Sequence, residues 1–250
     1  MNIIQDIILT NKGIIYKSFK LAIKNWKIFL VGIAYFIFSI LMFRIASYAW
    51  ILGGIIIALF QSAIISNYLY LIENIIEYEK FTLEDFKRGF TVYLRKIYTI
   101  LIIFWFVGFG ADLFLRPIVS MRIGGFSLWF IIQILAFILL NSLPETIYQK
   151  HYIGFDIITY SFEFIKENFF EWFIPNICII ALIWAVHIIT NKVMFLIGLN
   201  LNIFSMLKIL IDAVVYILLI SYGMIYRGKL FNVLSTSTRR KRMFMRNMYK

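Results

Sequence analysis

The chain is short of cysteine, histidine and charge, and each shortage excludes a class of protein. Cys178 is the single cysteine, so no disulfide can form within one chain. His151 and His187 are the two histidines, which is too few for a three-histidine zinc site. Charged residues make up 15% of the 250 residues, whereas soluble domains carry about a quarter. The composition therefore excludes an ordinary soluble domain.

Sequence motifs of the common enzyme classes are missing as well. Neither His-Glu-x-x-His nor Gly-x-Ser-x-Gly occurs. The stretch 223–229 has the spacing of a phosphate-binding loop, but Leu230 stands where that loop needs Ser or Thr. The acidic cluster within 73–85 is interleaved with basic residues, which is typical of a solvated mixed-charge helix rather than a metal site. We expect no metal, no cofactor and no enzymatic activity, although a membrane-embedded lipid enzyme without a motif stays open.

Hydrophobic residues, in contrast, are abundant: they make up 62% of the chain, and aromatic residues make up 19%. Several apolar runs reach the roughly 20 residues that are needed to cross about 30 Å of hydrocarbon. We therefore predict an all-α polytopic membrane protein with six transmembrane helices. Their expected positions are 28–46, 50–72, 97–115, 126–147, 173–190 and 204–226.

The 25 Lys and Arg residues are distributed unevenly between the segments that join these helices. If both termini lie inside, few basic residues fall on the outer side. These are Arg44, Arg116, Arg122, Lys192 and Lys208. The positive-inside rule therefore predicts a multi-pass protein of the plasma membrane with both termini in the cytoplasm. Residues 1–234 are expected to form a single membrane domain, and 235–250 a basic cytoplasmic tail.

A pattern recurs about every 72 residues, which predicts three internal repeats. Ser18-Phe19 is matched by Gly89-Phe90 and by Ser161-Phe162. Each repeat is an interfacial amphipathic helix followed by a helical hairpin, and together they are expected to form a pseudo-threefold bundle. Their approximate bounds are 12–80, 83–152 and 155–230.

Polar residues and glycines recur at matching positions of the predicted hairpins. The outer end of the first hairpin helix carries Arg44, Arg116 and His187. Within the second hairpin helix, Gln61 matches Gln133. The outer turns fall at Gly53-Gly54, Gly124-Gly125 and Gly198, where a flexible backbone permits a tight reversal.

The first amphipathic helix has two distinct faces. One face carries Ile15, Phe19, Ala22 and Trp26. The opposite face carries Lys17, Lys20, Lys24 and Lys27. Such a helix either lies in the cytoplasmic interface with its lysines at anionic headgroups, or packs beneath the bundle against protein. The sequence favours neither arrangement over the other.

Small residues predict how the second span packs. Gly54, Ala58, Ser62 and Ser66 recur at every fourth position and form a smooth stripe that allows close backbone approach. We favour packing within the chain over self-association through this stripe.

Charge inside the membrane marks the candidate functional position. Asp212 lies about 12 Å along the last predicted span, where an unpaired carboxylate is costly. Lys208 is one turn away, so an ion pair is the structural explanation. The functional hypothesis places Asp212, Lys208, Gln61 and Gln133 along a path for a proton, an ion or a small solute.

The tail carries a cluster of cations: Arg239, Arg240, Lys241 and Arg242. The last span holds this tail at the cytoplasmic surface, where each cation gains roughly 1 kcal/mol near anionic lipid. We predict contacts with lipid headgroups. Nucleic acid is the minor alternative, because no aromatic platform accompanies the cluster.

Residues 18–25 read Ser-Phe-Lys-x-x-x-Lys-Asn and precede long spans rich in Ile and Phe. This arrangement resembles bacterial six-span membrane proteins of unknown function. It is also similar to the membrane domain attached to some glycerophosphodiester phosphodiesterases. The resemblance covers most of the chain and implies the membrane fold. It does not imply phosphodiesterase activity, because the sequence carries no such catalytic domain.

Two functions from different classes follow. The first is a non-enzymatic accessory or scaffold component of a membrane complex, with lipid and another membrane protein as partners. The second is a transporter or channel for a small solute, ion or lipid, with Asp212 in its path. The odd number of hairpins is unlike the paired inverted repeats of many transporters, so we favour the first.

Overall fold

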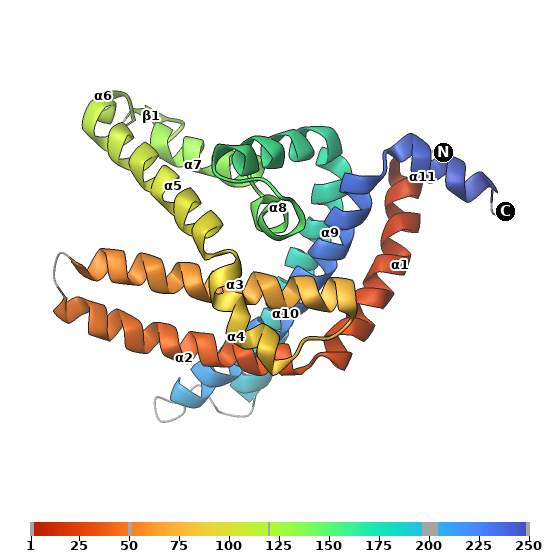
Figure 1. The fold of residues 1–250 in the computed structure, drawn as a ribbon, viewed down its shortest axis with the longest axis horizontal. Coiled ribbons are helices and arrows are strands. Elements are labelled where there is room, and N and C mark those ends of the chain that lie inside the picture. Colours follow the sequence, from red (N-terminus) through yellow and green to blue (C-terminus); the bar gives the residue numbers. More distant parts are fainter. Residues whose placement is uncertain (1–2, 50–51, 120, 197–204, 249–250) are drawn as a thin grey trace. The chain divides into compact units, whose positions relative to one another are not determined.

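A computed structural model describes residues 3–49, 52–119, 121–196 and 205–248. The described chain is almost entirely helical, which confirms the predicted all-α fold (Figure 1). Its one pair of strands is the short antiparallel hairpin of β1 (Arg122–Ile123) and β2 (Phe126–Ser127). Arg122 pairs with Ser127, and Ile123 pairs with Phe126.

The helices vary in length from one turn to 42 residues. They are α1 (Ile3–Lys24), α2 (Lys27–Tyr48), α3 (Gly53–Tyr78), α4 (Leu83–Val92), α5 (Leu94–Phe114), α6 (Arg116–Val119), α7 (Leu128–Leu139), α8 (Leu143–Gln149), α9 (Phe155–Leu196), α10 (Ser205–Thr236) and α11 (Arg239–Met248).

Six stretches of the described chain are long and apolar enough to cross a membrane, as the sequence predicts. They are Lys27–Tyr48, Gly53–Tyr78, Leu83–Phe114, Leu128–Gln149, Phe155–Val193 and Ile211–Thr236. Residues 50, 51 and 204 of the predicted spans lie outside the described residues. The length and composition of these described helices therefore fit a multi-pass membrane protein.

Two of these spans differ from the continuous helices that hydropathy predicts. The fourth is interrupted between Leu139 and Leu143, because Pro144 follows and proline cannot continue the preceding helix. The fifth is joined to its amphipathic leading segment in one long helix, α9. That helix changes direction at Asn168, where φ is −119° and ψ is 27°.

The outer turns show why glycine is needed there. Gly124 and Gly125 have φ of 60° and 88°, the left-handed backbone that a tight hairpin turn requires. At Gly53 a Cβ atom would lie 2.4 Å from the carbonyl oxygen of Ala46, so only glycine fits between α2 and α3. Gly198, the third predicted turn, lies outside the described residues.

The fold divides into two compact units. Unit 1 comprises Met1–Leu41, Leu71–Thr82 and Phe170–Lys250. Unit 2 comprises Met42–Tyr70 and Leu83–Phe169. Several helices therefore contribute residues to both units.

The core of unit 1 forms where α1 packs along α10 (Figure 1). Aromatic side chains fill it: the rings of Trp172 and Phe231 meet edge to face with centroids 6.3 Å apart, and both are fully buried. The guanidinium of Arg227 lies 5.0 Å from the centre of the Trp172 ring. Unit 1 is thus held together by aromatic packing as well as aliphatic contacts.

In unit 2, a short stretch of α3 packs against α4 through small and polar residues. The hydroxyl of Ser66 donates to the carbonyl oxygen of Gly89 at 2.7 Å and accepts from the backbone N–H of Tyr93 at 2.8 Å. A Cβ on Gly89 would lie 3.2 Å from the Cα of Asn67, so the two helices approach closely. Ser66 belongs to the predicted small-residue stripe, and its contact supports packing within the chain.

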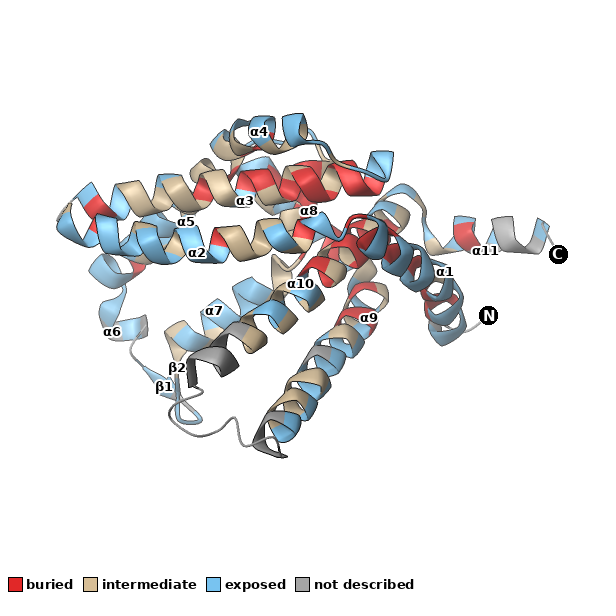
Figure 2. Cartoon of the chain, turned by 90° about the horizontal axis from the view of Figure 1, so that it is seen from below, coloured by how far each residue is buried: buried red, intermediate tan, exposed pale blue. Residues whose placement is uncertain are grey.

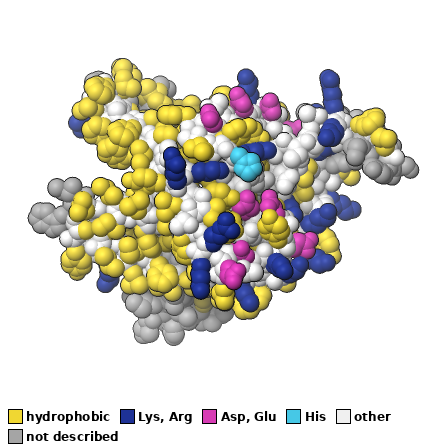
Figure 3. All heavy atoms as spheres, in the orientation of Figure 1, with side chains coloured by type: hydrophobic (Ala, Val, Ile, Leu, Met, Phe, Trp, Pro, Cys, Tyr) yellow, Lys and Arg dark blue, Asp and Glu magenta, His cyan; other side chains and the backbone are white. Residues whose placement is uncertain are grey.

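Burial is uneven along the spans. Figure 2 shows most buried residues of α3 gathered in its C-terminal half, while most residues of its N-terminal half are intermediate or exposed. Hydrophobic side chains cover the end of unit 2 formed by α5 and α7 in the upper left of Figure 3. Only 11% to 33% of each candidate span is buried within the protein. The remaining apolar surface is of the kind that lipid tails cover.

Matching positions of the predicted repeats have similar surroundings. Ser18, Gly89 and Ser161 are all buried. The side-chain amide of Asn25 donates to the carbonyl oxygen of Glu79 at 3.1 Å, and the ammonium of Lys96 donates to that of Lys150 at 2.8 Å. Asn25 of the first repeat corresponds to Lys96 of the second, and Glu79 corresponds to Lys150. The two bonds therefore join corresponding positions of the first two repeats. They support the threefold repeat, which stays a prediction.

Candidate functional site

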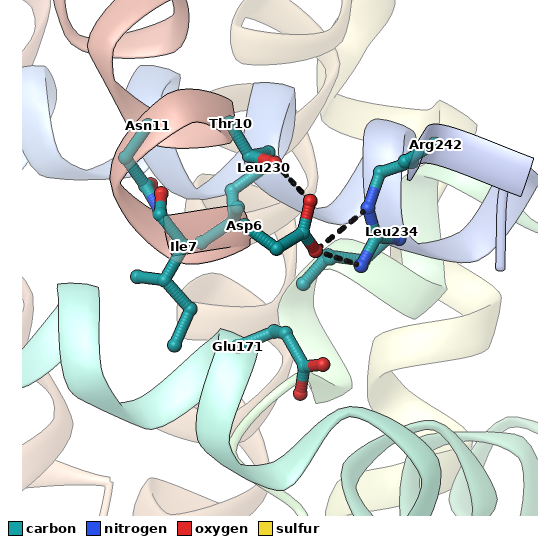
Figure 4. Close-up of a pocket in the computed structure, with 8 residues that line it drawn as sticks. All are labelled: Asp6, Ile7, Thr10, Asn11, Glu171, Leu230, Leu234 and Arg242. Atoms are coloured by element: carbon teal, nitrogen blue, oxygen red, sulfur yellow. Dashed lines mark hydrogen bonds and ion pairs between the residues drawn. The ribbon is translucent and has the colours of Figure 1, made fainter. Parts of the chain in front are cut away.

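A buried ion pair in unit 1 joins the first and last helices of the described chain. Nη2 of Arg242 on α11 lies 3.0 Å from Oδ2 of Asp6 on α1, and its Nε lies 3.4 Å from the same oxygen (Figure 4). The hydroxyl of Thr10 donates to the other oxygen, Oδ1, at 3.4 Å. The two charged side chains are 1% and 7% exposed. Each therefore depends on the other to compensate its lost hydration.

Arg242 also binds the end of α10. Its Nη1 donates to the carbonyl oxygen of Ser237 at 2.6 Å, one residue beyond the last residue of that helix. A cation at a helix C-terminus satisfies an unpaired carbonyl and interacts favourably with the helix dipole. One guanidinium thus connects α1, α10 and α11.

A second polar contact lies one turn along α1. The phenol of Tyr226 donates to Oδ1 of Asn11, and Nδ2 of Asn11 donates to the carbonyl oxygen of Ile7 at 2.7 Å. Tyr226 and Asn11 are both buried. Because both partners are satisfied, this contact fixes the register between α1 and α10.

These groups line a small recess, which Figure 4 shows from close by. Its empty space is about 160 Å³ including the part open to solvent, whereas small-molecule sites usually occupy about 300–1,000 Å³. The residues that line it are Asp6, Ile7, Thr10, Asn11, Glu171, Leu230, Leu234 and Arg242. The recess is too small for an ordinary substrate, and Asp6, Thr10 and Arg242 in its wall are bonded to one another. It is best described as a packing gap where α1, α9, α10 and α11 meet.

The predicted intramembrane residues are placed on three helices. Asp212 lies on α10 with a partly exposed side chain. Lys208 also lies on α10, but its side chain is outside the described part, so its pairing with Asp212 stays a prediction. Gln61 on α3 is partly buried and Gln133 on α7 is exposed. In the described part of unit 2, these two amides form no hydrogen bond with each other.

The three outer-end positions have different surroundings. Arg44 on α2 and Arg116 on α6 are exposed. His187 on α9 is partly buried: its Nε2 lies 2.9 Å from Nδ2 of Asn191, and its ring lies 5.4 Å from the ring of Tyr216 on α10. Tyr216 is one turn from Asp212 on the same helix. Sequence reasoning missed this polar contact between α9 and α10, because Tyr216 resembles any other aromatic residue of a span.

The cations predicted to contact lipid are mostly on the surface. Lys17, Lys20 and Lys24 on α1 are exposed, and so is Lys27, the first residue of α2. On α11, Arg240 and Lys241 are exposed, Arg239 is partly buried, and Arg242 is buried in the ion pair described above.

Lys24 forms an exposed ion pair. Its ammonium lies 3.0 Å from Oε2 of Glu79, which follows the end of α3. The hydrogen bond and the charge of Lys24 lower the pKa of Glu79 below its usual value. Glu79 has a positive φ of 60°, which places it in the turn between α3 and α4.

Two further lysines bind the ends of helices, a role that the sequence analysis did not assign. In unit 2, the ammonium of Lys96 donates to the carbonyl oxygens of Ile147 at 2.9 Å and Lys150 at 2.8 Å, at the end of α8. In unit 1, the ammonium of Lys229 donates to the carbonyl oxygen of Ile76 at 2.7 Å, near the end of α3. A lysine on a helix that packs beside the C-terminal end of another helix is the sequence signal that could have found these contacts.

Within the described ranges, no three His, Cys, Asp or Glu side chains are grouped so that they could hold a metal ion. Cys178 is exposed on α9. Comparisons with protein-family models, with curated proteins and with solved structures found no match for this chain. The resemblance to six-span bacterial membrane proteins therefore stays an expectation.

Proposed function

We propose that this chain is a non-enzymatic accessory or scaffold component of a complex in the bacterial plasma membrane, with both termini in the cytoplasm. The observation that carries the proposal is the low burial of the six candidate spans, of which only 11% to 33% lies within the protein. Apolar helix faces that a chain leaves uncovered are available to lipid and to the helices of other membrane proteins.

The buried polar contacts are consistent with this role. Asp6 and Asn11 tie α1 to its neighbours, and Lys96 and Lys229 hold the ends of other helices. Within each unit, these side chains stabilise a framework of helices whose ends are bonded to their neighbours. Such a framework suits a component that positions other proteins in a membrane.

A transport function has one specific observation in its favour. Asp212 lies on α10 one turn from Tyr216, and Tyr216 contacts His187 on α9. Ionisable residues inside a span are often part of an ion or proton pathway. This second candidate is weaker, because the recess found in the described residues lies elsewhere, beside Asp6, and is small.

The test is gentle extraction of the tagged protein from its native membrane, followed by mass spectrometry of everything that stays bound. A protein recovered in stoichiometric amount, and absent when the untagged strain is treated identically, would support the accessory role. A lone chain would contradict it. Ion flux into liposomes that is lost in Asp212→Asn and kept in Tyr216→Phe would then establish the transport function instead.

A further inference from the structure

The face of α1 that contacts protein is rotated from the apolar face expected from the sequence, and the two faces share Ala22. The buried positions are Asp6, Ile7, Asn11, Ile14, Ser18, Leu21, Ala22 and Asn25, whereas Phe19 is exposed. These buried residues are mostly small or polar, and Asn25 is anchored by its bond to the carbonyl oxygen of Glu79. The helix therefore buries one set of apolar side chains, Ile7, Ile14 and Leu21, and leaves a second set of large apolar side chains exposed.

Those apolar side chains form a stripe along the whole helix, which we call the α1 stripe. Their exposed fractions lie between 47% and 65%, so unit 1 covers them only in part; the Phe19 ring meets the edge of the Tyr222 ring on α10 with centroids 6.3 Å apart. At 3.6 residues per turn they share one side of the helix. The members of the α1 stripe are Ile4, Ile8, Ile15, Phe19 and Ile23 on α1, and Trp26 in the turn that follows the helix.

A basic face runs beside the α1 stripe. Lys17, Lys20 and Lys27 are exposed on it, and Lys24 is bonded to Glu79. The only acidic residue of α1 is Asp6, which is buried in its ion pair with Arg242. The solvent-accessible charge that α1 itself contributes is therefore positive.

We propose that α1 lies in the cytoplasmic interface of an anionic bilayer, with the α1 stripe among the acyl chains and the lysines at the headgroup phosphates. The combination of an exposed apolar stripe with a flanking basic face is the one that anionic membrane surfaces bind. A second copy of the chain fits less well, because it would bring two positive faces together. This surface would exist whether the chain serves a complex or a transport path.

The geometry of Asp6 and Arg242 gives the helix a fixed orientation. Asp6 projects from the protein-facing side of α1, and Arg242 binds it at 3.0 Å from α11. With Tyr226 bonded to Asn11 one turn later, α1 cannot rotate freely about its axis. The α1 stripe therefore faces one defined direction from unit 1, and lipid binding is not needed to fix that orientation.

The first test measures which solvent each face of α1 meets. The full chain carrying Cys178→Ser is reconstituted in nanodiscs containing phosphatidylglycerol, and spin labels are attached at Phe19→Cys or Ile23→Cys. The matched control is Lys20→Cys on the same helix. We expect oxygen to relax labels at 19 and 23 more than an aqueous nickel chelate does, with the reverse order at 20. A stripe accessible to nickel would face water, and one inaccessible to both reagents would be covered by protein; either result would overturn the proposal.

The second test asks whether the lipid is anionic. A fluorophore at Ile23→Cys is quenched with brominated phosphatidylglycerol or brominated phosphatidylcholine in mixed vesicles. We expect the anionic lipid to be enriched about fivefold near this position. In the triple variant K17Q/K20Q/K27Q, the ratio of anionic to zwitterionic lipid near position 23 should fall toward that of the bulk vesicle. The control K80Q/K87Q/K166Q removes as many exposed lysines from other segments, and there the enrichment should persist. Equal enrichment in both variants would contradict a role for the α1 lysines.

Discussion

The carboxylate of Asp6 and the guanidinium of Arg242 lie 3.0 Å apart although 236 positions separate them in the sequence. Their side chains are almost fully buried, and Arg242 also binds the carbonyl oxygen of Ser237. The pair closes unit 1 by joining its first helix to its last. Its strength therefore affects how α1 is held against α10.

Removing one partner of this pair should be costly. Asp6→Asn or Arg242→Gln leaves a buried charge uncompensated, and we expect each to lower the free energy of unfolding by about 3–5 kcal/mol. The double variant should cost less than the sum of the two, which measures the coupling between them. Thermal unfolding in a mild detergent checks this.

The exposed pair of Lys24 and Glu79 is the matched control. Its side chains are 52% and 64% exposed, so Lys24→Gln should change the unfolding temperature much less than Asp6→Asn does. An Asp6→Asn variant that is no less stable than Lys24→Gln would show that the buried pair does not hold unit 1 together.

Lys96 should stabilise the end of α8 in unit 2. Its ammonium donates to two carbonyl oxygens there, at 2.9 and 2.8 Å. Lys96→Met keeps the aliphatic stem and removes both bonds, so we expect a loss of about 1.5–3 kcal/mol. Arg95→Gln removes the charge of an exposed neighbour and should be nearly neutral. Thermal unfolding of the two variants decides the matter, and equal losses would contradict the capping role.

Acid should weaken the contact between Lys24 and Glu79. The bonded ammonium holds the pKa of Glu79 below its usual value of 4.5, so the folded state binds this proton less readily than the unfolded state. The contribution to stability is therefore present above pH 4.5 and is lost as the pH falls through the lowered pKa. The difference in unfolding temperature between the wild type and Glu79→Gln, measured against pH, should shrink across that window. A difference that stays constant would contradict the assignment.

The number and positions of the spans could be predicted because hydropathy is a local property. The break in the fourth span was not predicted, although Pro144 was an available signal; proline alone does not decide the matter, because Pro175 lies inside α9. The bond between Asp6 and Arg242 could not be predicted, because no local pattern links residues at opposite ends of a chain. The protein-facing side of α1 could not be predicted for another reason: the sequence favoured neither lipid nor protein as the partner of its apolar face, and Ser18 and Asn25 are buried against protein without a hydropathy signal. In membrane proteins, small and polar residues often make the helix contacts.

Two adjacent glycines at the start of α3 should respond differently to the same substitution. A Cβ on Gly53 would lie 2.4 Å from the backbone oxygen of Ala46, and a backbone atom cannot move aside easily. We expect Gly53→Ala to destabilise unit 2 by about 1–3 kcal/mol. A Cβ on Gly54 meets nothing within 4 Å, so Gly54→Ala should be neutral or slightly stabilising, as alanine favours helix. Similar unfolding temperatures for both variants would contradict the close approach of α2 and α3.

The orientation in the membrane can be tested with single cysteines in the Cys178→Ser background. Positive charge is concentrated in segments predicted to be cytoplasmic, while Arg122 lies in the short β-hairpin between α6 and α7. A membrane-impermeant thiol reagent should therefore label Arg122→Cys in intact cells, and Lys80→Cys only after the membrane is opened. Both positions are exposed in the structure, so a failure to react cannot be attributed to burial. Labelling of Lys80→Cys alone in intact cells would reverse the orientation, and it would place the α1 lysines on the outer surface.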